Sequence, residues 1–456
     1  MKMTVSAWFT CLVCIVAPAT AQTGGALAQR LDSIAGAGVR EDRAVGIVAA
    51  VAQRQDTLLL EAYGQSDVAR DVPMTVDTII PIGSTTKQFT AAAILKLQDQ
   101  GRLDVDDDIT TWLPDFETAG AVVTLRHLLA HTSGVVDGGE IAELRAIQLL
   151  TNLTATRDDV YEVIRRQPLQ FPTGTTQRYS NTNFWLLGRV VERVSGMSYE
   201  DYIEQALFEP LGMTRSRYCD SPYRMPGGAF GYGLRNGNVL RGPDVVHTVT
   251  FASGSICSTA EDMVTWLRAL HGGRVLSPQS YTEMITPARL DDGTALLYSM
   301  GLSVGEDAYG HRYIGHNGGG FGFSSEARWY PERELAVVVL TNSEPDAITQ
   351  TTIDLAAAVL PAALPAGSFA DDASLLAGTY RGPGRGQDMV IEVTATPDGL
   401  AFAFDGAPAV PLPWVEGRAF RRGDGLLTFR GLTADGSPAE LRVDTVGDYF
   451  VLAREQ

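Results

Sequence analysis

Two pairs of β-rich runs, one near each end of the first 360 residues, constrain the fold of this chain most. The first pair is Val45–Val51 and Thr57–Tyr63, and the second pair is Ala327–Tyr330 and Leu335–Thr341. Apolar, β-branched runs around a short polar turn are typical of β-hairpins. The long stretch between the pairs has mainly helical periodicity. The pattern therefore predicts one sheet, built from distant parts of the chain, around a large helical insertion.

Helical segments are expected before the first hairpin, after the second hairpin, and in the insertion between them. Gly24–Ala37 precedes the first hairpin, and Asp346–Leu360 follows the second one. The insertion should contain the helices Thr85–Gln100, Asp158–Arg166, Asn183–Val194, Tyr199–Leu207 and Ala260–Leu270. The sequence thus predicts an N-terminal and a C-terminal helix that flank the sheet.

The composition changes after residue 360. The segment LPAALPAGSFADDAS, residues 360–374, is rich in proline, alanine and small polar residues, which is typical of a linker. Beyond it come short alternating runs separated by glycine-rich turns: Met389–Thr396, Leu400–Phe404, Leu426–Arg430 and Tyr449–Arg454. These runs predict a small all-β barrel. We therefore expect a main domain at 22–361, a linker at 362–374 and a lipocalin-like β-barrel domain at 375–456.

The first 21 residues, MKMTVSAWFTCLVCIVAPATA, have the layout of a secretory signal peptide. One lysine precedes a short apolar run, and Ala19-Thr20-Ala21 supplies a small-residue cleavage site. The alternatives are a lipoprotein signal through Cys14 and a buried N-terminal helix. No other apolar run approaches the roughly 18 residues needed to cross a bilayer. We expect an exported protein, periplasmic or secreted, with no transmembrane span in the mature chain.

The net charge limits the classes of partner, and the cysteine content limits the possible disulfides. The net charge of −18 argues against nucleic acids and anionic lipid surfaces as partners. Removal of the signal peptide would leave Cys219 and Cys257 as the only cysteines. Two cysteines in an exported protein can form one disulfide, or they can remain separate buried thiols.

Lysine is rare in this chain, and one lysine lies three residues after a serine. Of 36 basic residues only three are lysine, namely Lys2, Lys87 and Lys96. Residues three apart share one helical face about 5–6 Å apart, so Lys87 would lie within reach of the Ser84 hydroxyl. An amine can take up a serine proton and so activate the hydroxyl as a nucleophile. A guanidinium cannot do so, because it stays protonated in proteins.

Two further motifs follow in the order that this chemistry needs. Tyr179-Ser180-Asn181 opens a predicted helix, and His316-Asn317-Gly318 leads into a strand. With S-x-x-K, Y-x-N and H-x-G in this order, the sequence resembles the serine β-lactamase and DD-peptidase superfamily. The resemblance is closest to its class C-like branch, which includes esterases and D-amino-acid peptidases. The segments TLRHLLAHTSGV (124–135) and GSICSTAEDMVTWLRAL (254–270) also resemble framework segments of that family.

The resemblance extends over roughly residues 27–360 and implies both a fold and a set of roles. The implied fold is α/β (α+β), with an antiparallel sheet, flanking terminal helices and a large helical insertion. By resemblance, Ser84 is the nucleophile, and Lys87 and Tyr179 share the proton transfers, because a phenol beside a lysine can accept a proton near neutral pH. The backbone amides of Ser84 and Gly319 form the expected oxyanion hole.

The remaining motif residues are expected to bind substrate. Asn181 can donate to or accept from a substrate amide or ester. Gly318, with the two glycines after it, lets a substrate backbone approach the strand closely. His316 stands where many members have a lysine that binds a substrate carboxylate. We expect it to act through a hydrogen bond rather than through a fixed charge.

Neither a metal nor a cofactor is predicted. His127 and His131 lie four residues apart, but no H-E-x-x-H motif or carboxylate ligand accompanies them. No nucleotide-binding fingerprint is present either. The primary hypothesis is an exported serine hydrolase that cleaves a small-molecule or peptide substrate through an acyl-enzyme. Candidate substrates are esters, D-amino-acid peptides, including cell-wall peptides, and β-lactams. The alternative is a non-catalytic binding or sensor protein on the same scaffold.

Overall fold

The computed structural model describes residues 19–149, 155–219, 226–235, 237–344, 348–361, 369, 371–384, 388–397, 399–445 and 447–455. Most of the predicted signal peptide, residues 1–18, lies outside the described residues. The same is true of residues 362–368 and 370 in the predicted linker.

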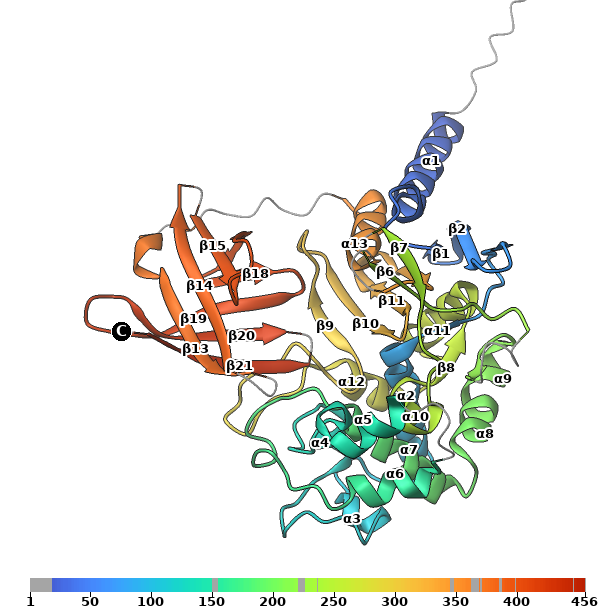
Figure 1. The fold of residues 1–456 in the computed structure, drawn as a ribbon, viewed down its shortest axis with the longest axis horizontal. Coiled ribbons are helices and arrows are strands. Elements are labelled where there is room, and N and C mark those ends of the chain that lie inside the picture. The colour runs from blue at the N-terminus through green and yellow to red at the C-terminus, as the bar shows by residue number, and fades with distance from the viewer. Residues whose placement is uncertain are drawn as a thin grey trace, which may run out of the picture.

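The main sheet joins strands from both ends of the first 360 residues, as the sequence predicts. Its order is β3-β2-β1-β12-β11-β10-β9, and its neighbouring strands are antiparallel. The strand bounds are β1 Gly46–Gln53, β2 Asp56–Asp67, β3 Val72–Pro73, β9 Ser303–Glu306, β10 Arg312–Gly320, β11 Phe323–Tyr330 and β12 Leu335–Thr341. The central pair β1 and β12 is apolar on both faces, because helices cover both sides of it (Figure 1).

Alternate residues of β1 belong to two separate hydrophobic clusters. Ile47, Ala49 and Val51 pack with residues of α1 (Ala19–Arg40) and α13 (Ile348–Val359). The residues between them point the other way, into the core of the helical insertion. A strand exposes successive side chains to opposite faces, so this pattern places the sheet as the middle layer between two sets of helices.

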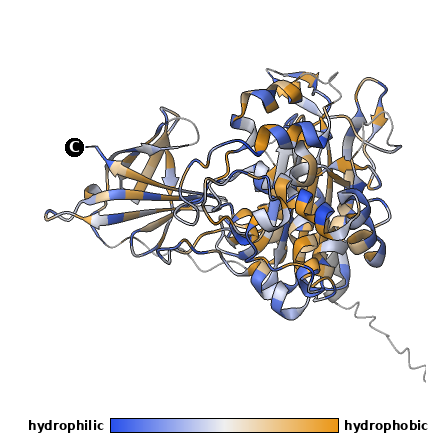
Figure 2. Ribbon diagram, turned by 90° about the horizontal axis from the view of Figure 1, so that it is seen from below, coloured by the Kyte–Doolittle hydropathy of each residue, from blue (hydrophilic) through white to orange (hydrophobic). Residues whose placement is uncertain are grey.

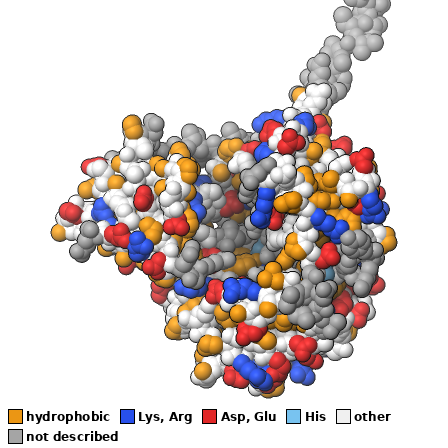
Figure 3. All heavy atoms as spheres, viewed as in Figure 1, with side chains coloured by type: hydrophobic (Ala, Val, Ile, Leu, Met, Phe, Trp, Pro, Cys, Tyr) orange, Lys and Arg blue, Asp and Glu red, His pale blue; other side chains and the backbone are white. Residues whose placement is uncertain are grey.

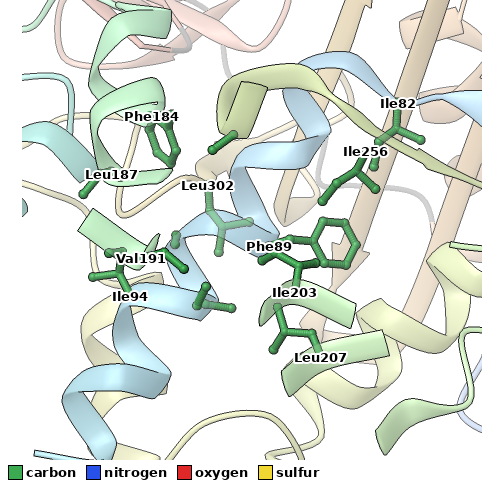
Figure 4. Close-up of a cluster of buried hydrophobic side chains, with 14 of the residues drawn as sticks. Ile82, Phe89, Ile94, Phe184, Leu187, Val191, Ile203, Leu207, Ile256 and Leu302 are labelled. Atoms are coloured by element: carbon green, nitrogen blue, oxygen red, sulfur yellow. The ribbon is translucent and has the colours of Figure 1, made fainter. Parts of the chain in front are cut away.

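The helical insertion is organised around a buried helix, α2 (Lys87–Asp99), which begins directly after a 3-10 turn at Gly83–Thr86. Figure 4 shows Phe89 and Ile94 of α2 packed among side chains of α7 (Asn181–Ser195) and of the segment around Ile203 and Leu207. The other helices are α3 Ile109–Trp112, α4 Leu125–Leu129, α5 Ala142–Leu149, α6 Arg157–Ile164, α8 Tyr199–Ile203, α9 Glu209–Leu211, α10 His247–Gly254, α11 Ala260–His271 and α12 Pro278–Ile285.

Two helix predictions differ in detail from the structure. The segment expected as a helix from Thr85 starts with the 3-10 turn, because Gly83 has a φ of +50° and the chain turns sharply there. The segment expected as one helix over Tyr199–Leu207 is α8 followed by a single π-helical turn at Glu204–Phe208.

A second, small sheet links the segment before Ser84 to a disulfide. Its order is β4 (Ile80–Pro81), β8 (Ile256–Ser258) and β5 (Arg217–Tyr218). Cys219 follows β5 and forms a disulfide with Cys257 of β8. A separate hairpin comprises β6 (Tyr232–Arg235) and β7 (Asn238–Arg241).

The C-terminal residues form a nearly closed barrel of nine strands within the described part, in the order β16-β15-β14-β13-β21-β20-β19-β18-β17. The bounds are β13 Gly378–Pro383, β14 Asp388–Thr396, β15 Gly399–Phe404, β16 Val410–Leu412, β17 Trp414–Glu416, β18 Ala419–Arg422, β19 Gly425–Leu432, β20 Pro438–Thr445 and β21 Asp448–Arg454. Hydrophobic and hydrophilic residues alternate along its strands (Figure 2). The sequence predicted four of these strands. It missed the other five, among them β20, which carries three charged residues.

Ion pairs join the barrel to the main sheet. The guanidinium of Arg328, on β11, pairs with Glu326 at 2.8 Å and with the barrel residue Asp424 at 2.5 Å, and its side chain is only 1% exposed. Arg421 of the barrel pairs with Glu306 on β9 at 2.6 Å. In Figure 3 the barrel projects from the main body on the left. Among the described residues, no helix has the length and apolarity that a membrane crossing requires.

Candidate active site

The structure brings Ser84 and Lys87 together at the start of α2. Lys87 Nζ lies 3.0 Å from Ser84 Oγ. The turn that carries Ser84 is held against the main sheet, because Ser325 donates a hydrogen bond to the carbonyl of Ile82 and also contacts Thr85 at 2.7 Å. The segment that carries Ser84 is therefore fixed to a rigid element and not to a loop.

Lys87 is fully buried and has two further partners. Its Nζ donates to Asn181 Oδ1 at 2.8 Å and to the carbonyl of Ser253 at 2.9 Å. Burial lowers the pKa of Lys87 from 10.5 to about 7, partly offset by the carboxylate of Asp137. Both oxygens are pure acceptors, and a neutral amine has two N–H groups for them. Its lone pair then remains for the proton of the Ser84 hydroxyl.

The carbonyl of Ser253 reaches Lys87 from an irregular helix. The backbone of Phe251 has φ 36° and ψ −131°, which interrupts α10 two residues before Ser253. A positive φ at a bulky residue is strained, and such strain concentrates at functional sites. No sequence motif signals this partner, because the contributing group is a backbone carbonyl.

Tyr179 and Asn181 lie at the N-terminus of α7, next to Lys87. The Nζ of Lys87 lies 4.7 Å from the centre of the Tyr179 ring. Because the side-chain oxygen of Asn181 accepts from Lys87, the predicted contact with a substrate would use its amide N–H groups. The backbone N–H of Asn181 donates to Asp137 at 2.5 Å, which fixes the start of the helix.

His131 holds the segment that carries Tyr179 and Asn181. It is fully buried with a φ of +61°, and its Nδ1 accepts from the backbone N–H of Ser180 at 3.2 Å. Its ring packs on the ring of Tyr179 with centres 4.3 Å apart. His127 instead caps α4 together with Thr124. Among the described residues, no group of three or more His, Cys, Asp or Glu could hold a metal ion.

The third motif places glycines directly beside the nucleophile turn. A Cβ on Gly318 would lie 2.7 Å from the backbone nitrogen of Ser84, so a larger residue cannot fit there. β9 pairs with β10 only as far as Gly315, so the segment 316–320 has no pairing with β9. An extended substrate could therefore lie along this stretch, near the backbone N–H groups of Ser84 and Gly319.

His316 is buried beside Tyr298. Its side chain is buried, and its Nε2 is 2.9 Å from the hydroxyl of Tyr298, which the sequence analysis did not single out. Burial and the nearby Lys87 lower the pKa of His316 to about 3, so the ring is neutral. His316 is not among the described residues that line the pocket around Ser84, and its hydrogen bond to a substrate stays a prediction.

Ser84 opens into a pocket of about 240 Å³. Its apolar lining residues include Leu144, Ile164, Trp185, Val249, Phe321 and Phe323. Its polar lining includes Asn181, Gly319 and Gln148, which comes from α5. The arrangement can therefore accept an apolar side chain next to a carbonyl group placed at Ser84.

Comparison with known proteins identifies the family. The family model described as Beta-lactamase matches residues 31–360, which is more than half of the chain. The chain belongs to the Beta-lactamase family. The resemblance seen in the sequence is therefore confirmed, and the family and its structural neighbours point to a serine hydrolase.

Individual members of the Beta-lactamase family and solved structures agree with this assignment. Penicillin-binding protein 4* of Bacillus subtilis is 28% identical over 65% of this chain and 67% of its own length. The D-stereospecific amidohydrolase from Streptomyces sp. is 28% identical over 72% of this chain and 97% of its own, with a TM-score of 0.63. A structure titled SurE with D-Leu is 26% identical over 94% of this chain and 100% of its own, with a TM-score of 0.60. The chain thus spans about two thirds of the curated relative and nearly all of the solved ones.

Proposed function

We propose that this protein is an exported serine hydrolase that cleaves amides or peptides of apolar D-amino acids through an acyl-enzyme on Ser84. The observation that carries the proposal is the buried Lys87 amine, 3.0 Å from Ser84 Oγ, with a pKa of about 7. A hydroxyl in the rigid turn and an amine of low pKa at the start of α2 support the roles of nucleophile and base. Export rests on the signal-peptide pattern of residues 1–21.

The proposed mechanism uses the groups in two stages. Lys87 takes the proton of Ser84 as Oγ attacks the substrate carbonyl, and the backbone N–H groups of Ser84 and Gly319 receive the developing oxyanion. Tyr179 and Lys87 deliver the proton to the leaving amine, which leaves an acyl-enzyme. Water then attacks the acyl group, with the same groups accepting its proton, and Ser84 is released.

Two features support an amide substrate with an apolar side chain. The pocket lining beside Ser84 is largely hydrophobic and aromatic. Both amide atoms of Gln148, which also lines the pocket, are buried, and no hydrogen bond to either is found in the described part of the chain. An amide side chain can donate to and accept from a substrate peptide group, which would satisfy both atoms.

The D configuration is proposed from the relatives. Their titles name a D-stereospecific amidohydrolase, a D-amino acid amidase complexed with D-phenylalanine, and SurE with D-Leu. Leucine and phenylalanine are also the side-chain types that an apolar pocket would accept. Simple esters and β-lactams use the same acyl-enzyme chemistry and remain comparison substrates.

Covalent labelling tests the proposal directly. A fluorophosphonate or penicillin probe should add to Ser84, as located by mass spectrometry, and Ser84→Ala should abolish the adduct. A panel of D- and L-phenylalanine amide, D-alanyl peptides, p-nitrophenyl esters and nitrocefin should show preferential cleavage of the D amide. No adduct with any probe and no turnover would instead support the non-catalytic binding protein.

A further inference from the structure

The C-terminal barrel reaches the catalytic segment through the start of β21. Tyr449 donates its backbone N–H to the carbonyl of Gln177 at 3.1 Å. The hydroxyl of Thr176 donates to the carbonyl of Tyr449 at 3.4 Å. The carboxylate of Asp448 accepts the backbone N–H of Tyr179 itself at 3.0 Å. Residues 448–449 thus lie alongside residues 176–179, which are about 270 positions earlier in the chain.

The residue before Asp448 touches the side chain of Tyr179. Gly447 is buried and has a φ of +92°. A Cβ at this position would lie 2.5 Å from Cδ2 of the Tyr179 ring and 3.2 Å from its Cβ. Only a glycine allows the barrel backbone to lie this close to the ring. The position of the ring is therefore coupled to the position of the turn.

The turn is itself held firmly. Asp448 is 7% exposed and pairs with Thr445 across the β20–β21 ladder. Arg442 of β20 forms an ion pair with the buried Asp444 at 2.6 Å and also donates to the carbonyl of Ala295 in the main body at 2.7 Å. The turn is thus held by the barrel, and its neighbouring strand β20 is bonded to the main body. It can therefore limit the position of a neighbouring side chain.

We propose that Gly447 and Asp448 are positioning residues for Tyr179, so that the barrel completes the active site instead of forming an independent module. The proposal rests on the proposed role of Tyr179 in proton transfer. The carboxylate of Asp448 fixes the backbone of Tyr179, and the Gly447 backbone limits the ring on one side. A proton-transfer group displaced by about 1 Å can cost about 10²-fold in rate.

A matched pair of glycine variants in the full-length protein tests the contact at Gly447. Gly447→Ala should lower kcat for the amide about 10²-fold with little change in KM, because the added methyl displaces the Tyr179 ring. Gly436→Ala is the control. Gly436 is another barrel turn glycine, with a φ of +83°, but its nearest neighbour to an added Cβ is Leu375 at 3.6 Å. Both variants should lose stability because of the positive φ, and Gly447→Ala should lose more because of the clash with the ring. Measured below both melting temperatures, only Gly447→Ala should lose kcat.

Two variants of Asp448 test the hydrogen bond. Asp448→Asn keeps a side-chain oxygen for the N–H of Tyr179 and should retain near-normal kcat. Asp448→Ala leaves that buried N–H without its acceptor and should lower kcat. Suppose that the wild type labels at Ser84. Equal kcat values for Gly447→Ala and Gly436→Ala, measured below both melting temperatures, would then overturn the positioning role alone. A wild type that neither labels at Ser84 nor turns over any substrate would overturn the proposed function and this inference with it.

Discussion

Replacing Lys87 by arginine should abolish acylation of Ser84 while a positive charge remains in the site. At pH 7 an amine with a pKa of about 7 is half neutral, whereas a lysine at pKa 10.5 is neutral in about one molecule in 3,000. Arginine has no neutral form at this pH. Loss of a positioned general base costs about 10²–10⁴-fold, so we expect kcat/KM to fall at least about 10²-fold.

Lys96 is the matched control for this substitution. It lies nine residues further along the same helix, is partly buried, and donates to the carbonyl of Val275 at 3.3 Å. A guanidinium can make that bond equally well, so Lys96→Arg should leave kcat/KM almost unchanged. Thermal melts of both variants separate loss of catalysis from loss of folding. Steady-state hydrolysis of a D-amino-acid amide, together with the rate of probe addition to Ser84, measures catalysis.

The pH dependence of the wild type gives an independent test of the same reasoning. The base is the neutral amine, so kcat/KM should rise with pH, level off above about pH 7, and fall tenfold per pH unit below it. Equal and modest effects of the two arginine variants would refute the role of Lys87 as a base. So would a rate that stays constant between pH 5 and pH 8.

Four further predictions follow from other parts of the structure. Gln148→Leu should lower kcat/KM for the D-amino-acid amide several-fold more than for a p-nitrophenyl ester, and equal losses would argue against an amide contact. Cys219→Ser should cost about 4 kcal/mol of unfolding free energy, because the disulfide to Cys257 closes a loop with a sequence separation of 38; denaturant melts of oxidised and reduced wild type check the same value. A protein ending at Pro361 should fold, as judged by circular dichroism, but should melt earlier because Arg328 loses its ion pair with Asp424. Burial lowers the pKa of His271 to about 3, below the ordinary 6.5. The free energy of unfolding should therefore decrease as the pH is lowered from 6.5 to 3, by up to about 1.4 kcal/mol per pH unit. This slope should be smaller in His271→Phe.

Local sequence patterns predicted the central strands and most of the long helices of the main body. The apolar, β-branched run Leu335–Thr341 predicted a strand, and the structure places it at the centre of the main sheet. The family, too, could be identified from three short motifs. Each of these signals depends on residues close together in the chain, where spacing alone fixes which side chains can meet.

The electrostatic state of the site depended on the tertiary structure. The sequence places Lys87 one turn from Ser84, but the low pKa arises because other elements bury the amine completely. The Ser253 carbonyl and the Tyr298 hydroxyl reach the site from segments that carry no motif. The third motif predicted a substrate contact at His316, and the tertiary structure adds the Tyr298 hydroxyl as a neighbour of its buried ring.

The barrel shows most clearly which features follow from local sequence and which arise only from tertiary contacts. The alternating runs and the glycine-rich turns of residues 375–456 specify strands and their connections, because side-chain period and turn conformation are local properties. Nothing local to Gly447 or Asp448 indicates that they lie against Tyr179. That contact exists only because the barrel docks on the main body, through Arg328 and Asp424 among other pairs. The sequence by itself thus determined the elements and the nucleophile motif, while packing between distant segments decided the charge state of Lys87 and the neighbours of Tyr179.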